Sequence, residues 1–494
     1  MRAPSSRVIC LLLVIFFQEV YSSFSLQHYS RSREHLTKFR KIVAAKSKPL
    51  VTLEDNGQKQ NGRVFYPIGY GADPTGAQDS SVAILSSIND AFKVQSGLEL
   101  LPGVNDLGGV VIDLQGGNYK IDQPIRLPSG GGNVVIQSGT LRASSIFPGD
   151  RHLIELWSPS SPKFQNADLV RPTNFTDIKA ANVGIYYEDI TFHDILFDSS
   201  FRGGGIFIID SARIRISDCF FIHFTTEGIL VQKGHETYVS NSFLGQQVTI
   251  GGNPGERDFT GIGIDLASND NAITDVVIFS AAIGIVLRGQ ANMITGVHCY
   301  NKATYWGGIG ILVRLAGNSQ TRIDNCYLDY NAIVLEDPVQ VHVSNAFFLG
   351  DGNIVLKSVK GQISGLTIVD NLFTGSPKNV PIVKFDGEFS NIDQVVVDRN
   401  TVAGMALKST VGKLTVAGNG TEWITDFSQI LLFPNKINHI QYSFYVRGQS
   451  GIPAHAVTNV TNNVVTVKSD RAVDGVVSVV VDQYNTGGEA SPYI

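Results

Sequence analysis

The sequence Gly205-Ile-Phe-Ile-Ile-Asp210 opens a region, residues 205–358, in which a short apolar strand recurs seven times. Successive repeats start 21 to 33 residues apart, at Gly205, Gly228, Gly261, Ala282, Gly308, Ala332 and Asn353. A second series of β-branched segments follows these strands after 10 to 15 residues. A period in the twenties without helical periodicity is typical of a solenoid, whose coils bury their apolar faces by stacking on one another. The Leu-x-x-Leu-x-Leu frame of leucine-rich repeats is absent.

We therefore predict an all-β fold, a right-handed parallel β-helix in which each coil adds one rung to two or three parallel sheets. Because side chains alternate along a strand, the second and fourth residues of each repeat should point into the coil. The second residues are Ile206, Ile229, Ile262, Ile283, Ile309, Ile333 and Ile354, and the fourth are Ile208, Val231, Ile264, Ile285, Ile311, Leu335 and Leu356.

The regions before and after the repeats divide the chain further. Residues 1–23 carry an Arg-containing start, an apolar run and small residues, as in a secretory signal peptide. Residues 24–62 form a basic arm, and the parallel β-helix is predicted over 63–414, with a helix after Asp79 that caps its open end. Residues 415–494 alternate apolar and polar positions, which predicts a small antiparallel C-terminal β-domain that caps the last coil.

A signal peptide predicts a secreted protein, which we expect to be a monomer with no membrane contact after signal removal. Three Asn-x-Ser/Thr sequons are candidate glycosylation sites: Asn174, Asn419 and Asn459. The net charge of −5 and the isoelectric point of about 6.1 argue against a nucleic-acid partner.

Three cysteines lie outside the signal peptide: Cys219, Cys299 and Cys326. We expect buried thiols, with a Cys299–Cys326 disulfide between adjacent coils as the alternative. No Cys-x-x-Cys pair predicts a metal site, and no cofactor is expected.

Two pairs of segments resemble known proteins. Tyr70–Ser80 (YGADPTGAQDS), with Gly108–Pro128 (GGVVIDLQGGNYKIDQPIRLP), resembles the entry of pectin-lyase-like β-helix proteins. Gly263–Ala281 (GIDLASNDNAITDVVIFSA), with Gly289–Thr304 (GQANMITGVHCYNKAT), resembles the quartet-type polygalacturonases of plants. The resemblance covers about residues 63–480. It implies hydrolysis of homogalacturonan, the polymer of α-1,4-linked galacturonic acid in pectin, in the extracellular cell wall.

A floor of glycines is the first candidate for substrate binding. At the third position of three successive repeats stand Gly263, Gly284 and Gly310, which the alternation places on the outer face. A glycine floor predicts a trough in which an extended polymer can lie. Crowding under a covering loop is the alternative explanation for these glycines.

Basic and aromatic residues border this floor. Arg288, Lys302 and Arg314 follow the next strands or turns, and Tyr305 is nearby. Cations suit a polyanionic sugar, and aromatic faces suit sugar rings. We predict that these four residues bind an anionic pectic polysaccharide.

Glycoside hydrolysis needs two carboxyl groups, which inverting enzymes hold roughly 6.5–9.5 Å apart. Carboxylates one or two coils apart can meet this condition, because neighbouring strands lie about 4.8 Å apart. The catalytic candidates are Asp265, Glu227 and Asp258, the last in the insertion between two repeats.

Two other functions stay open at this stage, because the usual polygalacturonase motifs (Asn-Thr-Asp, paired Asp, Gly-His-Gly, Arg-Ile-Lys) are absent from their expected positions. One is a non-catalytic, pectin-binding or structural wall protein. The other is a pectate lyase, which would need calcium and an arginine base, although no dense acidic cluster is evident. Endo or exo cleavage and methylation preference leave no mark in the sequence.

Overall fold

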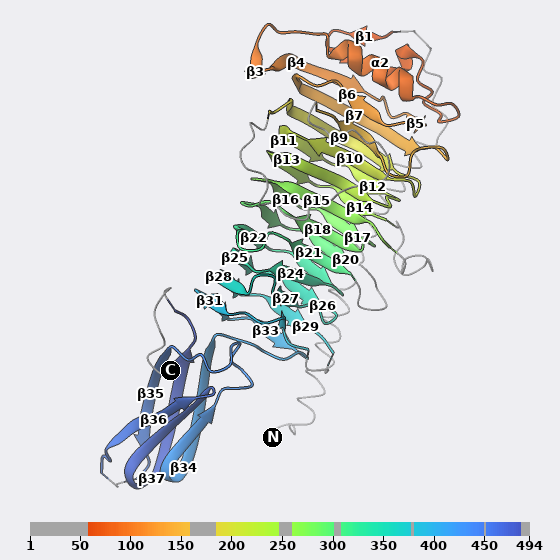
Figure 1. Ribbon diagram of the computed structural model, residues 1–494. Coiled ribbons are helices and arrows are strands. Elements are labelled where there is room, and N and C mark those ends of the chain that lie inside the picture. Colours follow the sequence, from red (N-terminus) through yellow and green to blue (C-terminus); the bar gives the residue numbers. More distant parts are fainter. Residues whose placement is uncertain are drawn as a thin grey trace, which may run out of the picture. The chain divides into compact units, whose positions relative to one another are not determined.

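Parallel strands stacked coil upon coil make up most of the protein (Figure 1), which confirms the predicted parallel β-solenoid. The structure is a computed structural model that describes residues 58–158, 184–246, 259–300, 308–376, 380–448 and 451–485. The predicted signal peptide, and the arm up to residue 57, lie outside the described residues. The domain boundaries drawn from the sequence stay predictions.

Each coil contributes to three parallel sheets, and long strands bend from one sheet into the next. The first sheet contains β6 (Ile125–Leu127), β8 (His152–Leu156), β10 (Gly204–Ile209), the start of β13 (Glu227–Ser240), β15 (Ile262–Asn269), β18 (Ile283–Leu287), β21 (Ile309–Val313), β24 (Ala332–Glu336), β27 (Ile354–Lys357) and β30 (Val383–Asp386). The second sheet contains β2 (Val64–Phe65), β4 (Val104–Asp113), β7 (Gly131–Ala143), β9 (Tyr187–Asp198), β11 (Ser211–Ser217), the end of β13, β16 (Ala272–Thr274), β19 (Met293–Thr295), β22 (Thr321–Asp324), β25 (Val339–Ser344), β28 (Gln362–Val369), β31 (Asn391–Asp393) and β32 (Val396–Asp398). The third sheet contains β5 (Asn118–Ile121), the ends of β7 and β9, β12 (Phe220–Ile222), β14 (Phe243–Gly245), β17 (Val277–Phe279), β20 (His298–Tyr300), β23 (Tyr327–Asp329), β26 (Phe347–Leu349), β29 (Leu372–Thr374) and β33 (Thr401–Ala403).

A helix closes the N-terminal end of the stack, as predicted. α2 (Ser81–Ala91) lies beside the first strands (Figure 1) and buries Ile84 and Ile88 in the same hydrophobic cluster as Val110 and Ile112. It therefore covers apolar side chains at the end of the stack where the described residues begin. The other elements there are β1 (Gln60–Asn61), η1 (Pro67–Tyr70) and β3 (Glu99–Leu101).

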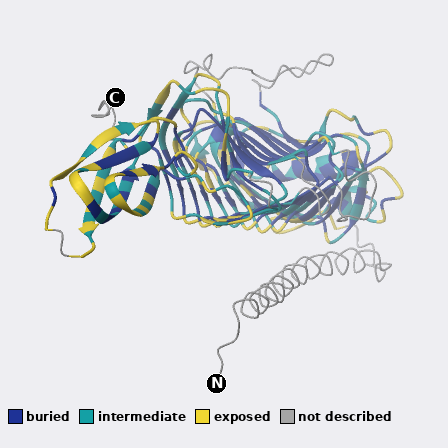
Figure 2. Ribbon diagram, turned by 90° about the horizontal axis from the view of Figure 1, so that it is seen from below, coloured by how far each residue is buried: buried dark blue, intermediate teal, exposed yellow. Residues whose placement is uncertain are grey.

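A four-stranded antiparallel sheet follows the last coil. β37 (Val464–Asp482) pairs with β34 (Val411–Asp426), β35 (His439–Val446) and β36 (His455–Thr461). The second half of β37 alternates buried and intermediate residues and β35 alternates intermediate and exposed ones, whereas buried residues dominate inside the solenoid (Figure 2). The small C-terminal β-domain is thus present, and the sequons Asn419 and Asn459 are exposed on it. Their glycosylation stays a prediction, and Asn174 lies outside the described residues.

The register of the first sheet corrects part of the predicted inner ladder. Ile264, not Ile262, lies opposite Ile229, and the ladder continues through Ile285 and Ile311. Ile262 instead lies opposite Glu227. Together with Ile283 and Ile309, Ile262 packs in a separate cluster with Val286, Leu312 and Val334, whose side chains alternate with core residues and so face outward.

The glycines between these positions face the interior, so the predicted outward glycine floor is wrong. An added Cβ would lie 2.9 Å from Ile278 Cγ2 at Gly263, 3.0 Å from Cys299 Sγ at Gly284 and 2.6 Å from Leu328 Cδ1 at Gly310. These three neighbours are fully buried residues of the third sheet. The glycines are therefore required by close packing where the chain enters the first sheet.

We predict that Gly284→Ala lowers the free energy of unfolding by about 2 kcal/mol, because overpacking a tight core forces the backbone to shift. The added Cβ would lie 2.5 Å from the carbonyl oxygen of Gly310 as well as against Cys299. Urea unfolding measures the loss. Gly149→Ala is the control, because Gly149 has an ordinary φ and no heavy atom within 4 Å of the added Cβ. Gly116 also has open space, but its φ of +71° would strain any side chain. Equal stability of the Gly284→Ala and Gly149→Ala variants would contradict this packing role.

The cysteines of the described residues, Cys219, Cys299 and Cys326, are all free and buried. The alternative Cys299–Cys326 disulfide is therefore wrong. Burial raises the pKa of the Cys219 and Cys326 thiols to about 12. Among the described residues, no helix has the length and apolar character needed to span a membrane.

Candidate active site

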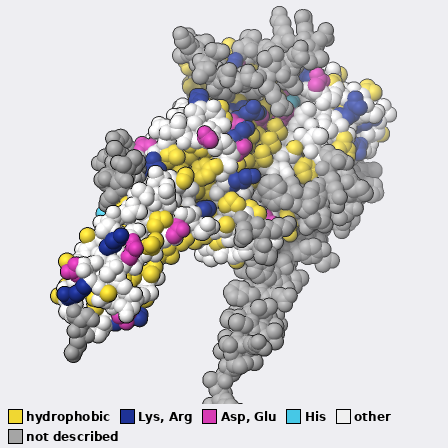
Figure 3. Space-filling model, turned by 60° about the horizontal axis from the view of Figure 1, so that its bottom comes forward, with side chains coloured by type: hydrophobic (Ala, Val, Ile, Leu, Met, Phe, Trp, Pro, Cys, Tyr) yellow, Lys and Arg dark blue, Asp and Glu magenta, His cyan; other side chains and the backbone are white. Residues whose placement is uncertain are grey.

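The outer face of the first sheet carries one row of side chains that runs from coil to coil. Strand pairing places them in the order Arg126, Glu155, Phe207, Leu230, Asp265, Val286, Leu312 and Val334. From Phe207 to Val334 the side chains of this row are apolar, except for that of Asp265. The space-filling view shows a face with a band of hydrophobic side chains that has basic and acidic groups beside it (Figure 3).

Asp265 is held by Arg288 in a two-point ion pair. Arg288 follows β18, one coil further on, and donates from Nε to Oδ1 at 2.7 Å and from Nη2 to Oδ2 at 2.8 Å. The Asp265 side chain is 4% exposed and that of Arg288 is 14% exposed. Such a paired, partly buried arrangement favours the ionised carboxylate and fixes the guanidinium.

Glu227 begins β13 and is buried beside His152, which lies two coils away on β8. The distance between Glu227 Oε2 and His152 Nε2 is 3.6 Å. Gly204 on the intervening strand permits this approach, because a Cβ there would lie 2.4 Å from His152 Cδ2. A glycine thus lets an imidazole lie across a strand and reach the carboxyl group beyond it.

The carboxylates of Asp265 and Glu227 both act electrostatically on the guanidinium of Arg288. The hydrogen bond that Arg288 donates to Asp265 raises the pKa of Arg288 against the effect of burial, and the charges of Asp265, Glu227 and Glu336 add to the increase. Glu227 and Asp265 therefore belong to one electrostatic cluster.

The cluster extends toward the later coils through Glu336 at the end of β24. Lys357 Nζ lies 3.1 Å from Glu336 Oε1, and Arg314 Nε lies 3.9 Å from Glu336 Oε2. The side chains of Arg314 and Lys357 are almost half exposed. They can therefore contact an anionic ligand while bound to Glu336.

A second basic cluster lies toward the earlier coils, around the buried Glu155. Its carboxylate accepts hydrogen bonds from Arg151 Nε at 2.8 Å and from Trp157 Nε1 at 2.7 Å, and it pairs with Arg126 Nε at 3.1 Å. The Arg126 guanidinium lies 4.4 Å from the Trp157 ring centroid and its side chain is 47% exposed. Cations therefore stand on the outer face both before and after Glu227 and Asp265.

A further acid, Asp329, ends β23 on the third sheet. Burial raises its pKa to about 7. It follows the inward residue Leu328 and comes just before β24, which lies four strands beyond β13 in the first sheet, so it stands roughly 19 Å along the stack from Glu227 at about 4.8 Å per coil. The structure does not bring it together with Glu227.

Of the predicted site residues, the structure groups Glu227, Asp265 and Arg288, and places Arg314 one coil further on. The predicted Asp258, Lys302 and Tyr305 lie outside the described residues. His152, Glu336 and Lys357 were missed. Glu336 and Lys357 end their repeats at in-register positions, which was an available signal, whereas nothing in the spacing links His152 to Glu227.

No group of three or more His, Cys, Asp or Glu side chains that could hold a metal ion occurs within the described ranges. The charges of the outer face are instead arranged as carboxylate–cation pairs. This arrangement suits an acidic ligand that exchanges its own carboxylates for those of the protein.

Comparison with known proteins identifies the family. No family model matches the sequence. The curated protein Polygalacturonase QRT3 of Arabidopsis thaliana is 51% identical over 426 residues, which cover 85% of this chain and 84% of that protein.

Solved structures match this chain at low sequence identity and with TM-scores below 0.5. ORF18 of Geobacillus virus E2 is 12% identical, with a TM-score of 0.48 over 82% of this chain and 76% of its own. The endo-xylogalacturonan hydrolase of Aspergillus tubingensis is 12% identical, with a TM-score of 0.44 over 70% of this chain and 95% of its own. The identity and coverage of the Arabidopsis protein carry the assignment: this chain belongs to the quartet-type polygalacturonases.

Proposed function

We propose that this protein is a glycoside hydrolase that cleaves the α-1,4-galacturonan of pectin in the plant cell wall. The observation that carries the proposal is a pair of carboxylates on a face with cations on either side: Asp265, which Arg288 binds at two points, and Glu227, whose charge acts on the same guanidinium. Family membership supports the same reaction.

The two carboxyl groups have environments that suit opposite roles. Asp265, bound at two points by Arg288, suits the ionised partner that activates water. Glu227, buried beside His152 and opposite the apolar Ile262, suits the proton donor to the glycosidic oxygen. After cleavage Glu227 is ionised and Asp265 holds the proton taken from the attacking water, so proton exchange with solvent restores both groups.

The spacing of the two residues favours inversion. Asp265 stands three residues beyond the position opposite Glu227, which is about 10 Å along the strand and about 4.8 Å across. Side chains that converge from this separation leave room for the attacking water of an inverting enzyme. Asp258 remains the alternative second carboxyl.

The basic residues are proposed to bind the carboxylates of the polymer. Arg314 and Lys357 would hold units on the later coils, and Arg126 those on the earlier coils. The apolar side chains between them are buried and form the base on which these charged groups stand.

Incubation of the purified protein with polygalacturonate tests the function. We expect new reducing ends, and proton NMR of the first products should show inverted anomeric configuration. Products that absorb in the ultraviolet would instead identify an eliminating lyase. Binding of unchanged polymer without new ends would favour the non-catalytic alternative.

A further inference from the structure

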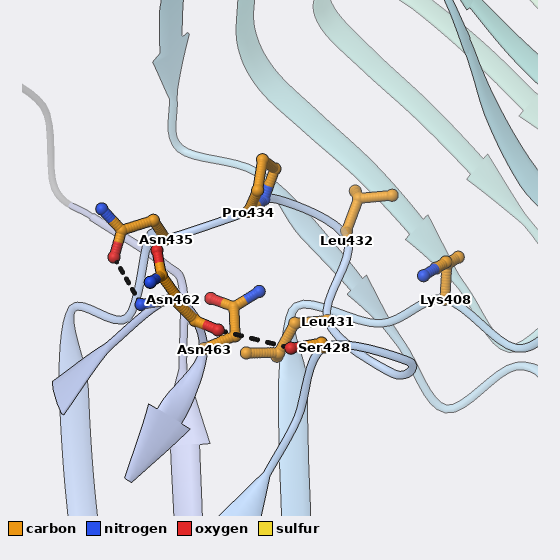
Figure 4. Close-up of a pocket in the computed structure, with 8 residues that line it drawn as sticks. All are labelled: Lys408, Ser428, Leu431, Leu432, Pro434, Asn435, Asn462 and Asn463. Carbon is orange, nitrogen blue, oxygen red and sulfur yellow. Dashed lines mark hydrogen bonds between the residues drawn. The ribbon is translucent and has the colours of Figure 1, made fainter.

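A pocket lies outside the first sheet, where loops of the C-terminal β-domain meet the chain that leaves the last coil. Its volume is about 270 Å³, near the lower end for small-ligand sites. Figure 4 shows Lys408 on one side, Asn435 and Asn462 on the other, and Leu431 and Leu432 between them. We call it the junction pocket.

The asparagine side of the junction pocket is held in one shape by hydrogen bonds. Asn462 donates from its backbone N to Asn435 Oδ1 at 2.8 Å, and Asn463 Nδ2 donates to the carbonyl of Phe433 at 2.9 Å. Asn462 and Asn463 form the two-residue turn between β36 and β37, with φ of 54° and 61° as a type I′ turn requires. Asn435 thereby holds the turn in place, while its amide nitrogen points away from the other lining residues (Figure 4).

The opposite side supplies a positive charge without an acidic counterpart. Lys408 Nζ donates to the carbonyl of Gln429 at 3.2 Å, and no acidic side chain forms an ion pair with it within the described residues. Burial lowers the pKa of Lys408, because removal from water disfavours the charged amine. An anion in the pocket would offset this cost.

The floor between the two sides is apolar. Leu431 and Leu432 are 2% and 5% exposed, and Pro434 stands at the rim. The pocket therefore combines one cation, amide and hydroxyl groups including Ser428, and a CH-rich surface. This combination matches a sugar ring that bears a carboxylate and hydroxyl groups.

We propose that the junction pocket is a second carbohydrate site, which binds one uronic-acid residue with its carboxylate on Lys408 and its hydroxyls on the asparagine amides. The identity of the sugar rests on the proposed function, because galacturonan is the acidic polymer that the first sheet would cleave. A second point of attachment raises the local concentration of the polymer at the first sheet.

Titration calorimetry with trigalacturonate tests the proposal on the full chain carrying Glu227→Gln, so that the ligand is not cleaved during the titration; turnover is measured separately in proteins that keep Glu227. Lys408→Met keeps the apolar stem and removes the charge, so we expect one of two classes of binding site to weaken by about tenfold or more, the effect of losing one charge-assisted bond. Lys360→Met is the matched control, because Lys360 Nζ also donates to a single backbone carbonyl, that of Ala316 at 3.1 Å, and lies outside the pocket. Turnover of trigalacturonate at saturation should be equal in all three proteins.

Several outcomes overturn the proposal: equal binding by the Lys408→Met and Lys360→Met proteins, equal binding of neutral galactotriose, or displacement by inorganic phosphate as effective as by galacturonate. Asn435→Asp provides a second variant, since an added negative charge should also weaken the site. The proposed function has a separate readout. Loss of the second binding class without any hydrolysis would support the site and refute the hydrolase, whereas hydrolysis with unchanged binding would do the reverse.

Discussion

Glu227→Gln is expected to lower kcat on polygalacturonate by about 10²–10⁴-fold, the usual contribution of a general acid or base. Glutamine has the shape of glutamate but cannot supply the proton. Folding should be little affected, because glutamine matches glutamate in size and the 3.6 Å distance from Glu227 Oε2 to His152 Nε2 is longer than a hydrogen bond. Reducing-end assays measure the loss, and thermal unfolding checks the fold.

Glu422→Gln serves as the control for this substitution. Glu422 is an acid on the C-terminal β-domain whose side chain is 45% exposed and pairs with Lys468 at 3.2 Å. Its replacement removes the same charge far along the chain from the first sheet and should leave kcat unchanged. If the Glu227→Gln and Glu422→Gln proteins were equally active, Glu227 would have no catalytic role.

Asp265→Asn is expected to lower the free energy of unfolding by about 3 kcal/mol, because it leaves the guanidinium of Arg288 buried without its carboxylate. A side chain on the outer face of a sheet usually contributes little to stability. The ion pair changes that expectation. Removing one partner leaves an uncompensated buried charge, which costs more free energy than the intact pair contributes to stability. Activity should fall as well, because Arg288 would lose its fixed position. Denaturant unfolding gives the stability and reducing-end assays the activity.

The double variant Asp265→Asn/Arg288→Gln separates the two effects. Removing both charges should recover most of the lost stability and none of the activity. A single Asp265→Asn variant as stable as the wild type would mean that the ion pair does not form in solution.

The fold could be predicted from the sequence because isoleucines recur with the period of one coil. Ile264, Ile285 and Ile311 recur at positions that only parallel stacking makes neighbours. The register was not predictable to the residue, because Ile262 and Ile264 are equivalent by alternation alone. What distinguishes them is the corner at Gly263, where contact with Ile278 of another sheet decides which side chain turns inward.

The candidate site was recoverable in part for the same reason. Asp265 and Arg288 lie on adjacent coils at nearly one period, so their proximity follows from the repeat. The contact of His152 with Glu227 does not, because it crosses a whole coil and depends on the missing Cβ of Gly204. The spacing of residues along the sequence therefore cannot predict this contact.

A crystal structure of the Glu227→Gln protein with tetragalacturonate tests the central claim most directly. We predict that the sugar chain lies along the outer face of the first sheet, with a glycosidic oxygen beside residue 227 and uronate carboxylates on Arg288 or Arg314. A tetragalacturonate bound on the second or third sheet, with residue 227 untouched, would contradict the account.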